Sequence, residues 1–126
     1  MLAQYLDLTE EFANSYDNDT GTYSVKIDVS NYDYAVVQFV DFLAEVNFYS
    51  TIDSGAVQGV TDGNALTSTN YSQVYATYLL DNTKVTVSPS NGTYRFDVVG
   101  RYIKLTNASG INLTTGKLLV MLTKIS

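Results

Sequence analysis

The segment YSVKIDVS, residues 23–30, alternates strictly between apolar and polar side chains. Tyr23, Val25, Ile27 and Val29 are separated by serine, lysine and aspartate, and this period of two is typical of a strand with one buried face. Valine, isoleucine, threonine and tyrosine, which favour strands, recur along the whole chain. The segment therefore predicts an all-β fold.

Strand-like segments continue beyond residue 30, with turn sequences between them. Asp62-Gly63-Asn64 and Pro89-Ser90-Asn91-Gly92 are two of these turns. About eight short strands without helical spacers predict a single antiparallel β-sandwich, jelly-roll or immunoglobulin-like, over residues 23–126. After the first strand we expect strands over 34–42, 45–52, 72–80, 84–88, 93–99, 101–107 and 117–125.

The first 22 residues lack the period of two. Leu8, Phe12 and Tyr16 lie about one helical turn apart, and Asp7 precedes them as a possible N-cap with Glu10 as its capping-box partner. A short helix over about 8–16 and an irregular arm both fit this pattern.

Residues 1–22 are predicted to be an N-terminal arm that contacts another chain and lies outside the sandwich. The arm carries several large apolar side chains, which would be a liability in water. Folding back onto the strand 117–125 is the rival prediction.

Two of the expected strands are apolar on both faces. In 34–42, Val36 and Val40 oppose Val37 and Phe39, and Phe42 is placed with Val36. In 117–125 the residues Leu118, Val120 and Leu122 oppose Leu119, Met121 and Ile125. Either the N-terminal arm or a neighbouring subunit must cover the second face. The candidate interface residues are Leu2, Tyr5, Leu6, Phe12, Tyr16, Leu119 and Met121.

Composition limits the possible partners. The 126 residues carry a net charge of −6 with only seven Lys and Arg, so no basic cluster is present to bind the phosphates of nucleic acid. No apolar run approaches the roughly 20 residues needed to span a bilayer. The start of the chain, MLAQYLDLTEEF, has neither the basic nor the apolar region of a signal peptide, and none is expected.

Two residue types that are common in catalytic sites are missing. The chain has no histidine and no cysteine, which excludes Ser-His and Cys-His catalysis and the usual zinc sites. Carboxylate pairs could still act as in glycosidases, but Asp28, Asp41, Glu45 and Asp97 lie among apolar neighbours, as solvated outer-face residues do. We predict a protein that is not an enzyme.

A calcium site is also not expected. Asp17, Asn18, Asp19 and Gly21 resemble the opening of a calcium loop, but the further ligands of an EF-hand are not at their required offsets. A turn is the better interpretation, and we predict no metal and no cofactor.

The tyrosines leave a carbohydrate-binding module open as an alternative. Tyr71, Tyr75 and Tyr78 flank one expected strand, and Tyr32 and Tyr34 sit beside another. Such rings can stack on sugars, but they serve equally well at core edges and protein interfaces.

A family resemblance lies in the second part of the chain. EVNFYSTIDSG, residues 45–55, and GTYRFDVVGRYIKLTN, residues 92–107, resemble a strand-and-turn pattern in the β-sandwich domains of tailed-bacteriophage structural proteins, and KLLVMLTKIS is similar to their last strand. The resemblance covers about residues 23–126. It departs at the extra Ser54 and at a missing loop tryptophan. The pattern also places turns at Gly92 and Gly100, with Lys104 pointing away from the core.

This resemblance implies a role and a location. Such domains decorate capsids, build fibres or form tail components, and none of their residues is catalytic. The expected function is an auxiliary or decoration protein on a capsid, made in the host bacterial cytoplasm and located in the virion. The expected partners are other virion proteins, the major capsid protein above all, and further copies of the chain. A tail or fibre component is the alternative within the particle.

Overall fold

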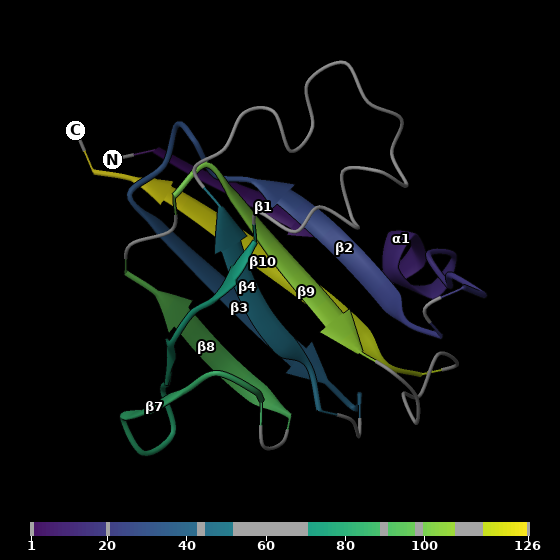
Figure 1. Cartoon of the computed structure of the whole chain (residues 1–126). Coiled ribbons are helices and arrows are strands. Elements are labelled where there is room, and N and C mark those ends of the chain that lie inside the picture. The colour runs from purple at the N-terminus through teal and green to yellow at the C-terminus, as the bar shows by residue number, and fades with distance from the viewer. Residues whose placement is uncertain are drawn as a thin grey trace.

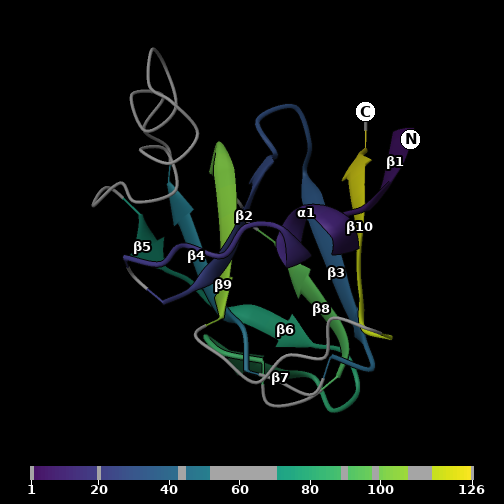
Figure 2. The ribbon, with the colours of Figure 1, turned by 90° about the vertical axis from the view of Figure 1, so that its right-hand side faces the viewer.

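The protein is a sandwich of two antiparallel sheets, seen face-on in Figure 1 and along their edges in Figure 2. The computed structural model describes residues 2–19, 21–42, 45–51, 71–88, 91–97, 100–107 and 115–125. One sheet has the order β1-β10-β3-β8-β6-β7 and the other β2-β9-β4-β5. The predicted all-β sandwich is confirmed.

The observed strands mostly match the predicted ones within a few residues, with two exceptions. The expected strand 72–80 is divided between the two sheets, and an unexpected strand, β1, precedes the others. The six-stranded sheet contains β1 (Leu2–Asp7), β3 (Tyr34–Val40), β6 (Ala76–Tyr78), β7 (Thr83–Val85), β8 (Gly92–Phe96) and β10 (Lys117–Lys124). The four-stranded sheet contains β2 (Tyr23–Asp28), β4 (Asn47–Thr51), β5 (Ser72–Gln73) and β9 (Tyr102–Asn107).

An aromatic cluster fills the space between the sheets. Phe39, Phe48 and Tyr94 are buried, and their ring centroids lie 5.5 to 6.5 Å apart. In its strand each of the three is flanked by more exposed neighbours, so its side chain points into the layer between the sheets. In β9, Ile103 and Leu105 are buried while Lys104 points outward, as predicted. The contacts among these rings hold the two sheets at a fixed spacing.

Phe42 is buried although the alternation of β3 places it on the outer face. Asp41, between β3 and Phe42, adopts a left-handed conformation with φ of 56°. This breaks the period of two and turns Phe42 into the core, where its ring lies 5.4 Å from that of Phe39. Its backbone N–H donates to Asn91 Oδ1 at 2.6 Å. Of the three residues predicted on the outer face of this strand, Val36 and Val40 lie there and Phe42 does not.

The N-terminal segment belongs to the sandwich, which corrects the prediction that residues 1–22 form an arm outside the 23–126 domain. β1 pairs antiparallel with β10 from Leu2↔Lys124 to Asp7↔Leu119, as the rival prediction of folding back requires. The helix α1 (Thr9–Ala13) follows, and its Phe12 side chain is fully buried against Tyr23 and Phe42. β1 lacks a clear period because only Leu6 among its residues is partly buried.

α1 is shorter than the predicted helix over 8–16 and begins differently. Leu8 is its N-cap and provides no side-chain hydrogen bond. Asp7 Oδ1 instead accepts hydrogen bonds from the backbone N–H and the hydroxyl of Thr9, and these bonds hold the pKa of Asp7 below its ordinary value. The same hydroxyl accepts a hydrogen bond from Leu118 N at 2.9 Å, so Thr9 ties the helix to β10. α1 is far too short to cross a membrane.

Two predicted turn glycines are sterically required. Gly92 has φ of 143°, and a Cβ there would lie 2.7 Å from the Tyr78 ring. Gly100 has φ of 62°, and a Cβ there would lie 2.8 Å from the carbonyl oxygen of Thr51. A larger residue at Gly100 would therefore clash with backbone, whereas at Gly92 it would require the Tyr78 side chain to move.

Alanine at Gly100 should therefore destabilise the protein more than alanine at Gly21. Gly21 has a similar φ of 69°, but a Cβ there meets nothing closer than 4.0 Å. Gly21→Ala should cost only the left-handed strain of about 1–2 kcal/mol, whereas Gly100→Ala adds a clash with backbone. Urea denaturation of both variants measures the difference. Equal losses would contradict the close approach at Gly100.

Candidate functional site

The outer face of the six-stranded sheet carries two rows of side chains that cross its strands. The strand registers align Tyr5, Met121, Val36 and Arg95 in one row. The neighbouring row contains Asp7, Leu119, Gln38 and Thr93. Each strand contributes alternate residues to this face, because successive side chains point to opposite sides of a sheet.

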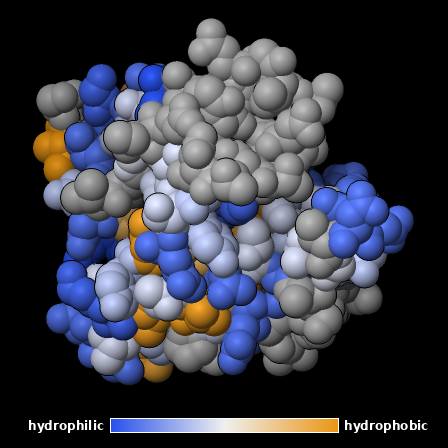
Figure 3. Space-filling model, in the orientation of Figure 1, coloured by the Kyte–Doolittle hydropathy of each residue, from blue (hydrophilic) through white to orange (hydrophobic). Residues whose placement is uncertain are grey.

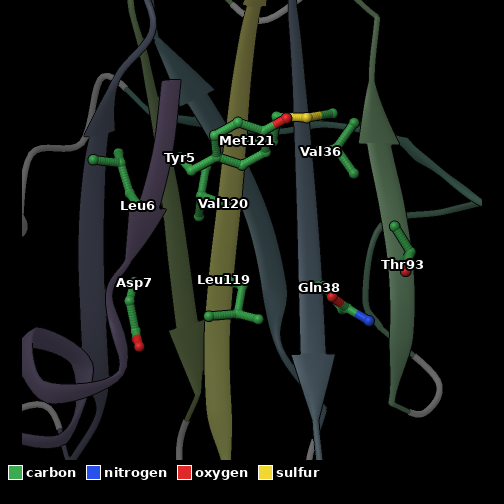
Figure 4. A pocket seen from close by; sticks show the side chains of 9 residues that line it. All are labelled: Tyr5, Leu6, Asp7, Val36, Gln38, Thr93, Leu119, Val120 and Met121. Atoms are coloured by element: carbon green, nitrogen blue, oxygen red, sulfur yellow. The ribbon is translucent and has the colours of Figure 1, made fainter. Parts of the chain in front are cut away.

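Four of these side chains form an apolar centre, which we call the apolar face: Tyr5, Val36, Leu119 and Met121. Tyr5 is 74% exposed and the other three are half-buried. Figure 4 shows the Tyr5 ring lying across β10 beside the thioether of Met121. The apolar face lines a shallow hollow of about 510 Å³. An apolar cluster on the outer face of a sheet is a candidate contact surface.

Polar groups surround the apolar face. Asp7, Gln38 and Thr93 line the same hollow. Next to Val36, Arg95 forms an ion pair with Asp97, with 2.7 Å between Nε and Oδ1. An apolar centre with a polar rim is the usual composition of a protein interface.

The structure divides the predicted interface residues into three groups. Tyr5, Leu119 and Met121 are brought together on the apolar face. Leu6 points toward the core, and Phe12 is fully buried, so its prediction as a contact for another chain is wrong. Leu2 and Tyr16 are exposed away from the centre, and the Tyr16 ring packs on Tyr23 at 4.9 Å. Val36 was missing from the predicted set, although the two-sided pattern of its strand identifies it.

β1 covers the edge of β10 and leaves its outer face open among the described residues. β1 lies beside β10 in the plane of the sheet, and Tyr5 is the β1 side chain that reaches across. The fold-back of the N-terminal segment therefore does not explain why Leu119 and Met121 are apolar.

The outer face of the four-stranded sheet has a different character. Figure 3 looks onto this side, and its coloured part is mostly blue or pale. Lys104 Nζ lies 5.2 Å from the ring centroid of Tyr49 and 4.6 Å from that of Tyr71. Lys26 and Arg101 both lie near the ring of Tyr102. Three of the seven cationic residues thus contact tyrosine rings on this sheet.

Burial shifts the pKa of two groups in this second cluster. Desolvation lowers the pKa of Lys104 because it penalises the charged ammonium. Desolvation, with a smaller effect of Tyr102, raises the pKa of Tyr71 to about 12. The Tyr71 hydroxyl is buried and has no hydrogen-bond partner among the described residues.

Of the tyrosines considered for sugar stacking, Tyr71, Tyr75 and Tyr78 do not form a common platform. Tyr78 is buried and stacks on Tyr94 at 4.8 Å. Tyr75 is 68% exposed, whereas Tyr71 lies by Lys104 on the four-stranded sheet.

The acidic residues lie mainly at the surface. Asp28, Asp41, Glu45 and Asp97 are all exposed, which confirms their predicted position on the surface. Asp17 Oδ1 accepts a hydrogen bond from Asp19 N at 2.8 Å. The residues that the structure describes contain no group of three or more Asp and Glu side chains arranged to hold a metal ion.

No protein-family model and no curated protein sequence matches the chain. Two solved structures share its fold. The SPBc2 prophage-derived protein YomS is 11% identical with a TM-score of 0.58, and the match covers 97% of this chain and 95% of YomS. The PBSX exported protein XepA is 14% identical with a TM-score of 0.59, and the match covers 97% of this chain but only 38% of XepA. Both neighbours have names that refer to phage elements.

Proposed function

We propose that this chain is a non-enzymatic structural protein of a bacteriophage particle, an auxiliary protein that decorates the capsid. The apolar face carries the proposal. Tyr5, Leu119 and Met121 form a contact surface on a regular sheet, and a repeated subunit that docks on a lattice needs such a surface. The partner is another virion protein, in first place the major capsid protein.

Two further observations support the proposal. The fold is shared with YomS, a prophage-derived protein, along nearly the full length of both chains. The sequence pattern of residues 92–107, which resembles phage sandwich domains, corresponds to β8 and β9 in the structure. The net charge of −6 keeps such a subunit soluble before it docks.

A protein census of purified particles tests the proposal. We expect the chain in particles at a copy number comparable with that of the major capsid protein. A few copies per particle would indicate a tail or fibre component instead. Absence from particles, together with binding on a glycan array, would favour the carbohydrate-binding alternative.

The docking surface is tested by placing a charge on it. Met121→Asp should lower incorporation into particles on the order of tenfold or more, because each 1.4 kcal/mol of lost contact energy is a factor of ten. Leu80→Asp is the matched control, since Leu80 is also exposed but lies in the turn after β6, away from the apolar face. Equal incorporation of both variants would show that the apolar face is not the docking surface.

A further inference from the structure

β1 presents an open row of backbone hydrogen-bonding groups at the edge of the six-stranded sheet. Leu8 N donates to Leu118 O at 2.9 Å, in the register that pairs β1 with β10. Backbone groups in an antiparallel pair point alternately toward and away from the partner. Counting back from Leu8, the groups of Ala3, Tyr5 and Asp7 therefore point away from β10. No described strand lies on that side of β1.

The other described sheet edges are short or carry a central lysine. β5 has two residues, and β7 has three with Lys84 in the middle. β2 is as long as β1 but has Lys26 near its centre. Short strands and edge lysines are the usual protections against pairing with another chain. β1, with the sequence LAQYLD, has neither lysine nor proline. Its single charged residue, Asp7, is the last residue of the strand.

The β1 edge is complementary to itself. If a second copy approaches antiparallel with Tyr5 opposite Tyr5, Ala3 lies opposite Asp7 and Asp7 opposite Ala3. Each of the three residues whose backbone groups point away from β10 then faces one such residue of the second copy. Each pair exchanges two N–H···O bonds. The two carboxylates lie at opposite ends of the pairing and do not oppose each other. In a register shifted by two residues, one of these three residues in each copy has no partner.

The side chains favour the same register. Tyr5 is the most exposed member of the apolar face, and at the centre of this pairing its ring meets the Tyr5 ring of the second copy. Directly opposed aromatic side chains stabilise antiparallel strands. The two apolar faces then join into one strip that crosses both copies.

We propose that two copies of this chain associate through β1, antiparallel and centred on Tyr5, so that two six-stranded sheets become one continuous sheet. This dimer is a property of the isolated protein and does not depend on its place in a phage particle.

Single cysteines test both the dimer and its register, since the chain has no cysteine of its own. In the proposed pairing the two Tyr5 Cα atoms lie about 5.5 Å apart, within the range of about 4.4–6.8 Å that a disulfide spans. Tyr5→Cys should therefore form a covalent dimer almost completely on mild oxidation. Ala3→Cys is the matched control on the same strand and face, and its two Cα atoms lie about 13 Å apart along the pairing. It should stay monomeric on a non-reducing gel.

A mixture of Ala3→Cys and Asp7→Cys chains should form the crossed disulfide, because these positions oppose each other. Sedimentation equilibrium of the unmodified protein should give twice the chain mass of 13.9 kDa, and Tyr5→Lys should give the monomer with unchanged circular dichroism. The proposal is overturned if the unmodified protein sediments as a monomer at all concentrations. Equal crosslinking of Tyr5→Cys and Ala3→Cys would also overturn it. The sedimentation result stands even if a cysteine variant fails to fold.

Discussion

Replacing Phe12 by alanine should lower the free energy of unfolding by about 3–5 kcal/mol, the usual cost of truncating a fully buried phenylalanine. Its ring lies 5.9 Å from that of Tyr23 and 5.4 Å from that of Phe42. Tyr23 is in β2 of the four-stranded sheet and Phe42 follows β3 of the six-stranded sheet, so Phe12 packs against both layers. Urea denaturation followed by circular dichroism measures the loss.

The control for this variant lies on the same helix. Glu11 is exposed, and Glu11→Ala should change stability by no more than about 0.5 kcal/mol. If Phe12→Ala lowered the free energy of unfolding by no more than Glu11→Ala, α1 would not be part of the core. That result would support the prediction of residues 1–22 as a separate arm.

Replacing Val120 by aspartate should unfold the domain at room temperature. Val120 is buried on the inner face of β10, between β1 and β3. A carboxylate there has no cation to pair with among the buried residues of the core. Burying an unpaired charge costs several kcal/mol, a large part of the about 5–15 kcal/mol that stabilises a domain. Loss of the cooperative melting transition is the expected result.

Met121→Asp, one residue further along the same strand, should leave the fold intact. Met121 is half-buried on the outer face, where a carboxylate can reach water, and its folding cost should be within about 1 kcal/mol. The two adjacent substitutions thus separate the roles of the two faces of β10. If both substitutions unfolded the domain, the outer face of β10 would not be open to water at Met121.

The alternation of apolar residues predicted most strands, because a half-buried strand needs one apolar face regardless of its partners. It predicted neither β1 nor the pairing of β1 with β10. β1 is an edge strand whose apolar residues Leu2 and Tyr5 are exposed, so burial leaves no regular period in its sequence. Phe42 shows a second limit, since the left-handed Asp41 reverses the side on which the next residue points.

The candidate site was predictable in part for the same reasons. The two-sided pattern of 117–125 predicted that Leu119 and Met121 lie together on the outer face of their strand, as they do. Phe12 was assigned to the interface on apolarity alone, and apolarity cannot distinguish a core residue from a contact residue. Tyr5 lies beside Met121 because β1 pairs with β10, and local sequence patterns do not predict the order of strands in a sheet. The contacts of Lys104 with Tyr49 and Tyr71 could not be predicted for the same reason.

The strand order also sets the time at which the protein can fold during its synthesis. β10 is the last strand in the sequence, but it lies between β1 and β3 in the sheet. While the ribosome still holds residues 117–124, β1 has no partner, and one edge of β3 is unpaired. Protein chains grow at about 5–20 residues per second, so β1 stays without its partner strand for several seconds after its own synthesis. The pairing of β1 into the six-stranded sheet is therefore a late event, which follows the synthesis of residues 117–124.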